Sequence, residues 1–148
     1  MGKKRLRDMT WDDYGISKNR YRELKAFCLQ YDEKKSRIQY GAGKSPAIGE
    51  GASPNSGFKE SPVERQAIQN SVYLRDVRMI EEAAIMADPG IWKYLLRSAT
   101  RGLSYEYIEY DDELGKIPMC RKDFYGVRKL FFSILNEIQM DHKWSVKT

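Results

Sequence analysis

The stretch that decides the fold is residues 61–102, which read SPVERQAIQNSVYLRDVRMIEEAAIMADPGIWKYLLRSATRG. It opens with Ser61 as a helix cap, a proline at the first helical position and Glu64 at the third, a combination that forms a capping box. Asp88-Pro89 repeats this start signal, and Gly102 suits a C-cap. Apolar residues recur at helical spacing on either side of Asp88-Pro89. The stretch therefore predicts one long helix followed directly by a second, shorter one.

The residues before this stretch predict a separate N-terminal helix. Ser17 can cap it, and an apolar stripe follows at helical spacing through residue 31, so we expect one amphipathic helix over residues 17–40. Residues 41–60 contain five glycines, three serines and two prolines, which is typical of a flexible linker. Residues 1–16 form a basic flexible tail in this interpretation.

The rest of the chain extends the helical pattern, so the predicted fold class is all-α. We expect a helical domain over 61–141, with a helix-turn-helix at about 104–138, and a tail over 142–148. In the motif, a short helix begins near Ser104, the chain turns around Gly115, and a long helix starts near Cys120 with a continuous apolar stripe.

Composition and charge limit the classes of function that the chain could have. The net charge is +5, and residues 1–40 carry all of it, with eleven Lys or Arg against six Asp or Glu. A basic segment favours an anionic partner such as nucleic acid, because binding releases condensed counterions. No apolar run reaches the length of a membrane span, so we expect a cytoplasmic protein of a bacterial host cell, with no membrane association. The single histidine and two distant cysteines predict no enzyme activity, no cofactor and no metal site.

The start of the last helix is the predicted DNA-binding site. In a helix-turn-helix this part enters the major groove, and Arg121 is the first candidate for a base contact because a guanidinium can pair with guanine in bidentate fashion. Lys122 and Lys129 suit phosphates, and Tyr125 suits either role. The complete predicted set is Arg121, Lys122, Tyr125, Arg128, Lys129, Ser104 and Tyr105, with auxiliary basic residues Lys18, Arg20, Arg22 and Lys25.

Two observations leave other interpretations open. A charged helix face also serves solubility alone. Five acidic residues also precede the turn without any basic one, and phosphates would repel them: Glu106, Glu109, Asp111, Asp112 and Glu113. They must face away from DNA, pair with basic helices or bind a protein partner.

Several short motifs resemble a known family, the phage-encoded late-transcription regulators of the RinA and ArpU type from phages of Gram-positive bacteria. The similar stretches are residues 21–25 (YRELK), 61–67 (SPVERQA), 102–107 (GLSYEY) and 117–125 (IPMCRKDFY). The resemblance implies a C-terminal domain similar to the promoter-reading domain of sigma factors and a role in switching on phage structural genes. The acidic segment 109–114 is longer than the turn usual in that family.

Three functions remain as hypotheses. The first is a sequence-specific transcription regulator that binds double-stranded DNA, as a homo-oligomer with a dimer favoured, and with host RNA polymerase as a further partner. The second is a small DNA-recognition subunit of a phage packaging terminase, which would assemble into rings. The third is a protein-interaction module that binds a host protein and has no affinity for DNA.

Overall fold

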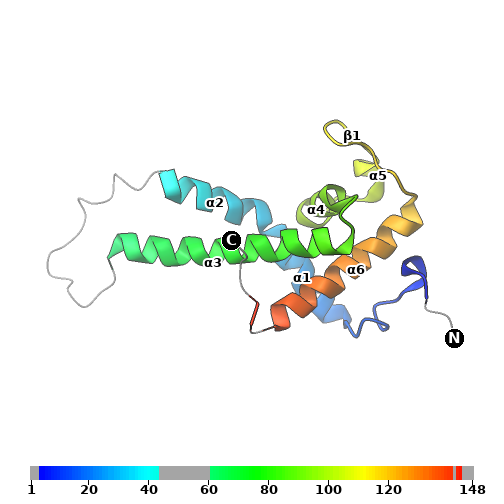
Figure 1. The fold of residues 1–148 in the computed structure, drawn as a ribbon, viewed down its shortest axis with the longest axis horizontal. Coiled ribbons are helices and arrows are strands. Elements are labelled where there is room, and N and C mark those ends of the chain that lie inside the picture. The colour runs from blue at the N-terminus through cyan, green and yellow to red at the C-terminus, as the bar shows by residue number, and fades with distance from the viewer. Residues whose placement is uncertain (1–3, 44–60, 142, 145–148) are drawn as a thin grey trace.

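The computed structural model describes residues 4–43, 61–141 and 143–144, and its regular structure is mostly α-helical (Figure 1). The all-α prediction is confirmed at that level. The elements are the 3₁₀ helix η1 (Leu6–Asp8), the helices α1 (Lys18–Leu29), α2 (Tyr31–Gly43), α3 (Pro62–Ala87), α4 (Trp92–Arg101), α5 (Tyr105–Ile108) and α6 (Arg121–Met140), and the strands β1 (Tyr110–Asp111) and β2 (Gly115–Lys116).

The predicted helix over residues 17–40 is two helices, α1 and α2, and the structure corrects the sequence interpretation here. Ser17 caps α1 as expected, since its side chain accepts a hydrogen bond from the Arg20 N–H. The break falls at Gln30, whose N–H bonds to the carbonyls of residues 27 and 28. The Lys34 N–H then bonds to the Gln30 carbonyl at 2.9 Å, so backbone hydrogen bonding bridges the junction. Residues 41–43 belong to α2, and the rest of the predicted linker lies outside the described residues.

Residues 61–102 fold as predicted into α3 and α4. Ser61 caps α3 by accepting the Glu64 N–H at 3.0 Å, with proline in the first turn. Asp88 ends α3, and α4 finishes at Gly102, which adopts the left-handed conformation with φ of 64°. These local signals needed no tertiary information, which is why their positions could be read from the chain.

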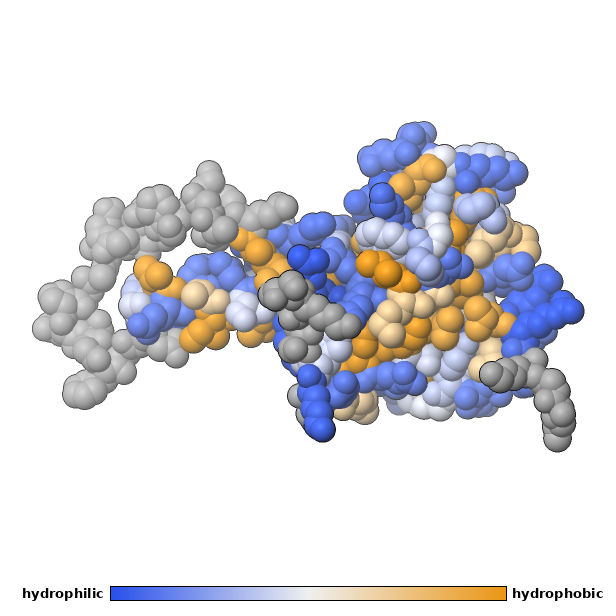
Figure 2. Space-filling view, in the orientation of Figure 1, coloured by the Kyte–Doolittle hydropathy of each residue, from blue (hydrophilic) through white to orange (hydrophobic). Residues whose placement is uncertain are grey.

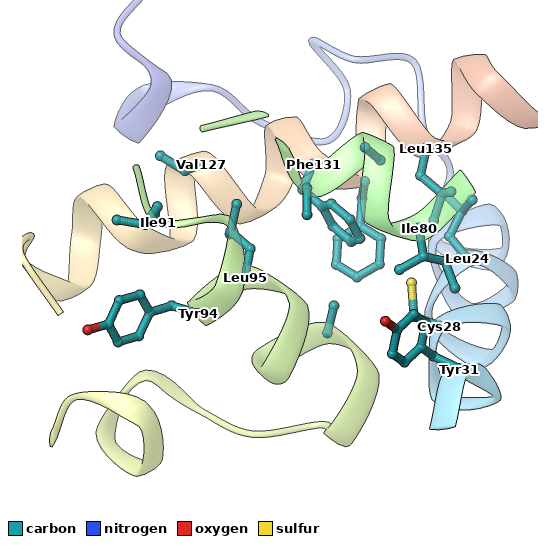
Figure 3. Packing of buried hydrophobic residues seen from close by; sticks show 14 of the residues in the cluster. Leu24, Cys28, Tyr31, Ile80, Ile91, Tyr94, Leu95, Val127, Phe131 and Leu135 are labelled. Atoms are coloured by element: carbon teal, nitrogen blue, oxygen red, sulfur yellow. The ribbon is translucent and has the colours of Figure 1, made fainter. Parts of the chain in front are cut away.

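The core lies where α1, α3, α4 and α6 meet. Figure 3 shows Leu24, Ile80, Leu95 and Phe131 pointing toward one another from these four helices. Each of the four is fully buried. Burial of apolar area at about 25 cal/mol per Å² makes such contacts the main stabilising contribution. The N-terminal helices therefore share the core of the predicted 61–141 domain instead of forming a separate unit.

Residues 4–16 pack on α6 and are not the flexible tail that the sequence predicts. Ile16 is 2% exposed, and the Trp11 ring lies 4.5 Å from the Tyr21 ring and 6.1 Å from the Phe132 ring. The reason is visible at Gly126, in the second turn of α6. A Cβ there would lie 2.7 Å from the Leu6 carbonyl oxygen, so only glycine lets the backbone of η1 approach the helix this closely.

The connection between α5 and α6 turns around Gly115, as the sequence predicts. Between them lies a two-stranded antiparallel ribbon in which Tyr110 pairs with Lys116 and Asp111 with Gly115. Gly115 takes φ of 80°, a conformation that favours glycine. The Tyr94 hydroxyl lies within hydrogen-bond distance of the Leu114 and Gly115 carbonyls, at 2.8 and 2.9 Å, and so holds the ribbon to α4. The short helix after Ser104 and the long helix after Cys120 form where the sequence predicts them, and the ribbon lies between them.

The α2–α3 pair extends beyond the body of the molecule, and we call it the arm (Figure 1). Hydrophobic surface gathers along it and over the middle of the molecule (Figure 2). The large exposed hydrophobic residues of α3 are Val63, Ile68, Val72, Leu74, Ile85 and Met86. None of the helices in the part of the chain that the structure describes is long and apolar enough to cross a bilayer.

Candidate nucleic-acid interface

The predicted DNA-binding residues of α6 separate onto two sides of the helix. Residues 121, 125 and 128 are spaced i, i+4 and i+7, so they share one side, and residues 122, 126 and 129 share another. The first side turns toward α5 and α1, and the second turns toward the N-terminal segment. The four cations therefore do not form a single outward face, as the sequence interpretation assumed.

On the first side, α6 and α1 together build a surface of alternating cations and aromatic rings. The Arg121 guanidinium lies 5.0 Å from the centroid of the Tyr125 ring. Arg128 Nη1 donates to the Tyr21 hydroxyl at 3.3 Å, and Lys25 Nζ lies 5.9 Å from the centroid of the Tyr21 ring. We call these five residues the basic–aromatic surface. Arg121 and Lys25 are exposed, whereas the other three are half-buried.

Arg128 is the least satisfied charge on this surface. Its guanidinium lies 5.0 Å from the centroid of the Phe132 ring, and its Nε is buried without a hydrogen-bond partner. Among the described residues, no carboxylate lies within ion-pair distance of it. Partly buried guanidinium groups are usually paired with an anion, because desolvation of an unpaired charge is costly. Arg128 therefore has unused capacity for an anionic ligand.

The exposed side of α1 extends the positive charge. Lys18, Arg22 and Lys25 are exposed and spaced i, i+4 and i+7, so they form one row along the helix. No acidic residue of the described chain pairs with Lys18 or Arg22. These three auxiliary residues are available to a ligand, as the sequence interpretation requires.

Arg20, the fourth auxiliary residue, is not. Its Nε donates to Asn136 Oδ1 and its Nη2 to Gln139 Oε1, both at 2.7 Å, while Nη1 lies 3.6 Å from a Glu23 carboxylate oxygen. These bonds fasten α1 to the end of α6. Arg20 is therefore occupied within the fold, and its expected contact with DNA stays a prediction.

The second side of α6 is largely covered, and Lys129 is occupied there, so its predicted contact with phosphate stays a prediction. Its Nζ donates to the Met9 carbonyl at 3.1 Å, and the N-terminal segment lies over Gly126 beside it. Lys122, at the start of the helix, remains exposed. Of the two predicted phosphate ligands, only Lys122 is free in this conformation.

Tyr105 holds α5 against the start of α6. Tyr105 is buried, and its hydroxyl donates to the Met119 carbonyl at 2.7 Å, so it has no free group for a phosphate. Its backbone N–H donates to the Tyr125 hydroxyl at 3.0 Å, which fixes the Tyr125 ring. Ser104, which is half-buried, precedes α5 without a side-chain cap bond to that helix. Tyr105 therefore positions Tyr125, and its predicted contact with DNA stays a prediction.

Basic residues of the chain partly neutralise the acidic segment. Arg97 binds Asp111 at 2.6 Å and Glu113 at 2.9 Å, and Arg121 binds Glu106 at 2.9 Å. The Leu114 N–H and then Arg97 hold the pKa of Asp111 below its ordinary value. A hydrogen bond from its own backbone N–H, followed by Arg121, lowers the pKa of Glu106. Both carboxyl groups are therefore ionised at neutral pH and paired with arginine side chains.

Sequence reasoning missed two residues of this region. Tyr21, read only as part of an apolar stripe, joins Arg128 to Lys25. Gly126 was a visible signal, because a glycine inside a helix costs stability unless something approaches its backbone. Across the described residues, no group of three or more His, Cys, Asp or Glu side chains could hold a metal ion.

Comparisons with protein-family models, with curated proteins and with solved structures find nothing that matches this chain.

Proposed function

We propose that this protein binds double-stranded DNA through the basic–aromatic surface and the row of cations on α1. The observation that carries the proposal is Arg128, a half-buried guanidinium without a carboxylate partner in the described chain, between the exposed cations Arg121 and Lys25. Lysine and arginine side chains bind phosphates, and binding gains from counterion release. The tyrosine hydroxyls supply further contacts to the sugar–phosphate backbone.

The biological role that fits this activity is a regulator of phage late genes, as the resemblance to the RinA and ArpU type implies. In this proposal Arg121 is the residue closest to reading a base, because it stands exposed at the first turn of a long helix. Binding would exchange its ion pair with Glu106 for a contact with DNA. Since an exposed pair contributes little, this exchange costs little.

Duplex binding by full-length variants tests the proposal. Arg121→Ala and Lys25→Ala should each weaken binding. Lys25→Ala removes a phosphate contact, so it should also lower the slope of log affinity against log salt by about one. Arg65→Ala is the matched control, since Arg65 is an exposed cation on the distant end of α3 and its loss should change neither quantity. Fluorescence anisotropy with specific and random duplexes gives both quantities. Equal binding by all three variants and the wild type would contradict the proposal.

The Arg121→Ala variant also distinguishes sequence-specific contacts with bases from non-specific electrostatic attraction to DNA. If it contacts a base, Arg121→Ala should lose about 1–3 kcal/mol on the preferred duplex and less on random DNA. Lys25→Ala should weaken both duplexes alike. A genomic-fragment selection with the wild type supplies the preferred duplex.

A protein partner is the second candidate, and the ribbon favours it. Tyr107 and Tyr110 are 78% and 66% exposed beside the acidic residues of this segment. Exposed aromatic residues are typical of protein interfaces. A host protein such as RNA polymerase would use this side, whereas a terminase subunit would show itself as a ring in mass measurements. Complete failure to bind duplexes at low salt would favour the protein partner.

A further inference from the structure

The N-terminal segment and α6 carry an inference that rests on the proposed DNA binding and concerns its regulation. We infer that residues 4–9, here called the cover, close the second side of α6 and must move away before that side can bind a duplex. The ligand of the uncovered side is the phosphate backbone of DNA.

The cover lies over the residues that a duplex would need. A Cβ at Gly126 would lie 2.8 Å from the Arg7 Cα and 2.7 Å from the Leu6 carbonyl oxygen, so the backbones are in direct contact. Lys129 donates to the Met9 carbonyl and is not free for a phosphate. With the cover away, Lys122 and Lys129 would flank a glycine, where a phosphate strand can approach the helix closely.

The cover is attached by backbone contact with α6 and by ion pairs at the surface, including Lys4 Nζ to Asp13 Oδ2 at 3.0 Å. None of the residues of η1 is buried, and Leu6 is 39% exposed. Arg7 Nε lies 3.2 Å from Asp123 Oδ1 but without hydrogen-bond geometry. A cavity of about 370 Å³ also lies between the cover and α6, lined by Arg5, Leu6, Arg7, Met119, Asp123 and Val127. A segment held by exposed ion pairs and backbone contact, with no buried side chain in η1, can open locally at a lower free energy than the buried core.

The segment after the cover is held firmly, so the cover can move without unfolding the core. Ile16 is buried, and Trp11 packs on Tyr21 and Phe132. Thr10 and Asp13 exchange backbone-to-side-chain hydrogen bonds of 2.9 and 3.1 Å. The boundary between the mobile and the fixed part therefore lies near Thr10.

Electrostatics and the cover make opposite predictions for the same variant. Arg7→Ala removes a positive charge, so charge alone predicts weaker binding to DNA. The same change removes the ion pair with Asp123, so release of the cover predicts tighter binding. Gly126→Ala leaves the charge unchanged and places a Cβ against the cover. Alanine also favours the helix over glycine, so α6 should remain folded.

The experiment measures duplex affinity and amide hydrogen exchange for the wild type, Gly126→Ala, Arg7→Ala and the control Arg65→Ala, all full-length. In Gly126→Ala the amides of Asp8 and Met9, which bond to the Arg5 and Leu6 carbonyls, should exchange faster. Its affinity should rise about tenfold, as when a competent state grows from a tenth of the molecules to nearly all. Arg7→Ala should also bind more tightly, and Arg65→Ala should match the wild type.

The outcomes separate the two proposals. If the wild type binds the duplex and neither Gly126→Ala nor Arg7→Ala binds it more tightly, the proposed role of the cover is wrong, while the proposed DNA binding stands. Unchanged exchange in Gly126→Ala would overturn it too, because the close approach would then not hold the segment. Failure of every variant to bind a duplex at low salt would remove the proposed function itself.

Discussion

At the scale of single residues, Tyr31 and Glu81 join the two helices of the arm. The Tyr31 hydroxyl donates to Glu81 Oε2 at 2.5 Å, and Lys35 Nζ lies 3.9 Å from the same carboxylate oxygen. Burial, followed by the bond to Glu81, raises the pKa of Tyr31 well above its ordinary value of 10.0. The neutral phenol is therefore the form that the folded protein stabilises.

The pH dependence of stability follows from this bond. A folded-state pKa above the unfolded one gives stability that is present below the unfolded pKa and is lost as pH rises through the folded pKa. The melting temperature of the wild type should fall from about pH 9 to about pH 11, and Tyr31→Phe should fall less while being less stable at neutral pH. Burial raises the pKa of Cys28 to about 12, so Cys28 also makes stability depend on pH at alkaline pH. Both the wild type and Tyr31→Phe retain Cys28, so the difference between their melting curves reports on Tyr31 alone. Parallel melting curves against pH would contradict the role of Tyr31.

At the scale of elements, the end of α4 depends on one glycine. Gly102 has φ of 64°, its N–H bonds to the Ser98 carbonyl, and a Cβ there would lie 3.7 Å from Leu29 Cδ2. Space is therefore adequate, and backbone strain is the dominant effect of a substitution.

Gly102→Ala should lower the free energy of unfolding by about 1–2 kcal/mol, the cost of a left-handed backbone with a Cβ. Gly102→Asn is the matched control, since asparagine tolerates this conformation better, and it should lose less. Urea denaturation measures both. Equal losses would indicate that the contact with Leu29 matters more than the backbone conformation.

Elements were predictable from the sequence where the signal was local. Ser61 marks the start of α3, Asp88 its end and Gly102 the end of α4. The predicted cap of α4 at Asp88-Pro89 is wrong, because α4 begins at Trp92 after Ile91, which makes no side-chain cap bond. The break at Gln30 carries no glycine or proline, and each strand of the ribbon has two residues, too few for an alternating pattern. The candidate site was less predictable. Helical spacing places Arg121 and Arg128 on a different side from Lys129, but it does not predict that a distant segment covers Gly126 and occupies Lys129. The only sign of this long-range contact in the sequence is Gly126 itself, a glycine inside a helix.

At the scale of the whole molecule, the arm offers a surface for a second copy, as the proposed homo-oligomer requires. Ile68 and Val72 are 53% and 51% exposed and lie one turn apart on α3. Exposed apolar side chains grouped on one element mark interaction sites more often than scattered ones do.

Ile68→Asp and Val72→Asp should therefore lower the mass measured by light scattering to that of a monomer. Thermal stability should stay nearly unchanged, because both side chains are largely exposed. Ser71→Asp adds the same charge at an exposed polar position of α3 and should leave the mass as it is. A wild-type protein that is monomeric throughout the accessible concentration range would rule out association through the arm.

The junction at Gln30 has a mechanical consequence. Because backbone hydrogen bonds continue across it, and α3 is a single helix of 26 residues, the arm is a stiff spacer roughly 39 Å long, anchored in the core over its second half. A partner bound at the N-terminal end of α3 would be held at a set distance from the row of cations on α1, because this end extends roughly 20 Å beyond the core. The length of α3 would then set the distance between a ligand bound at the row of cations on α1 and a partner bound at the end of the arm.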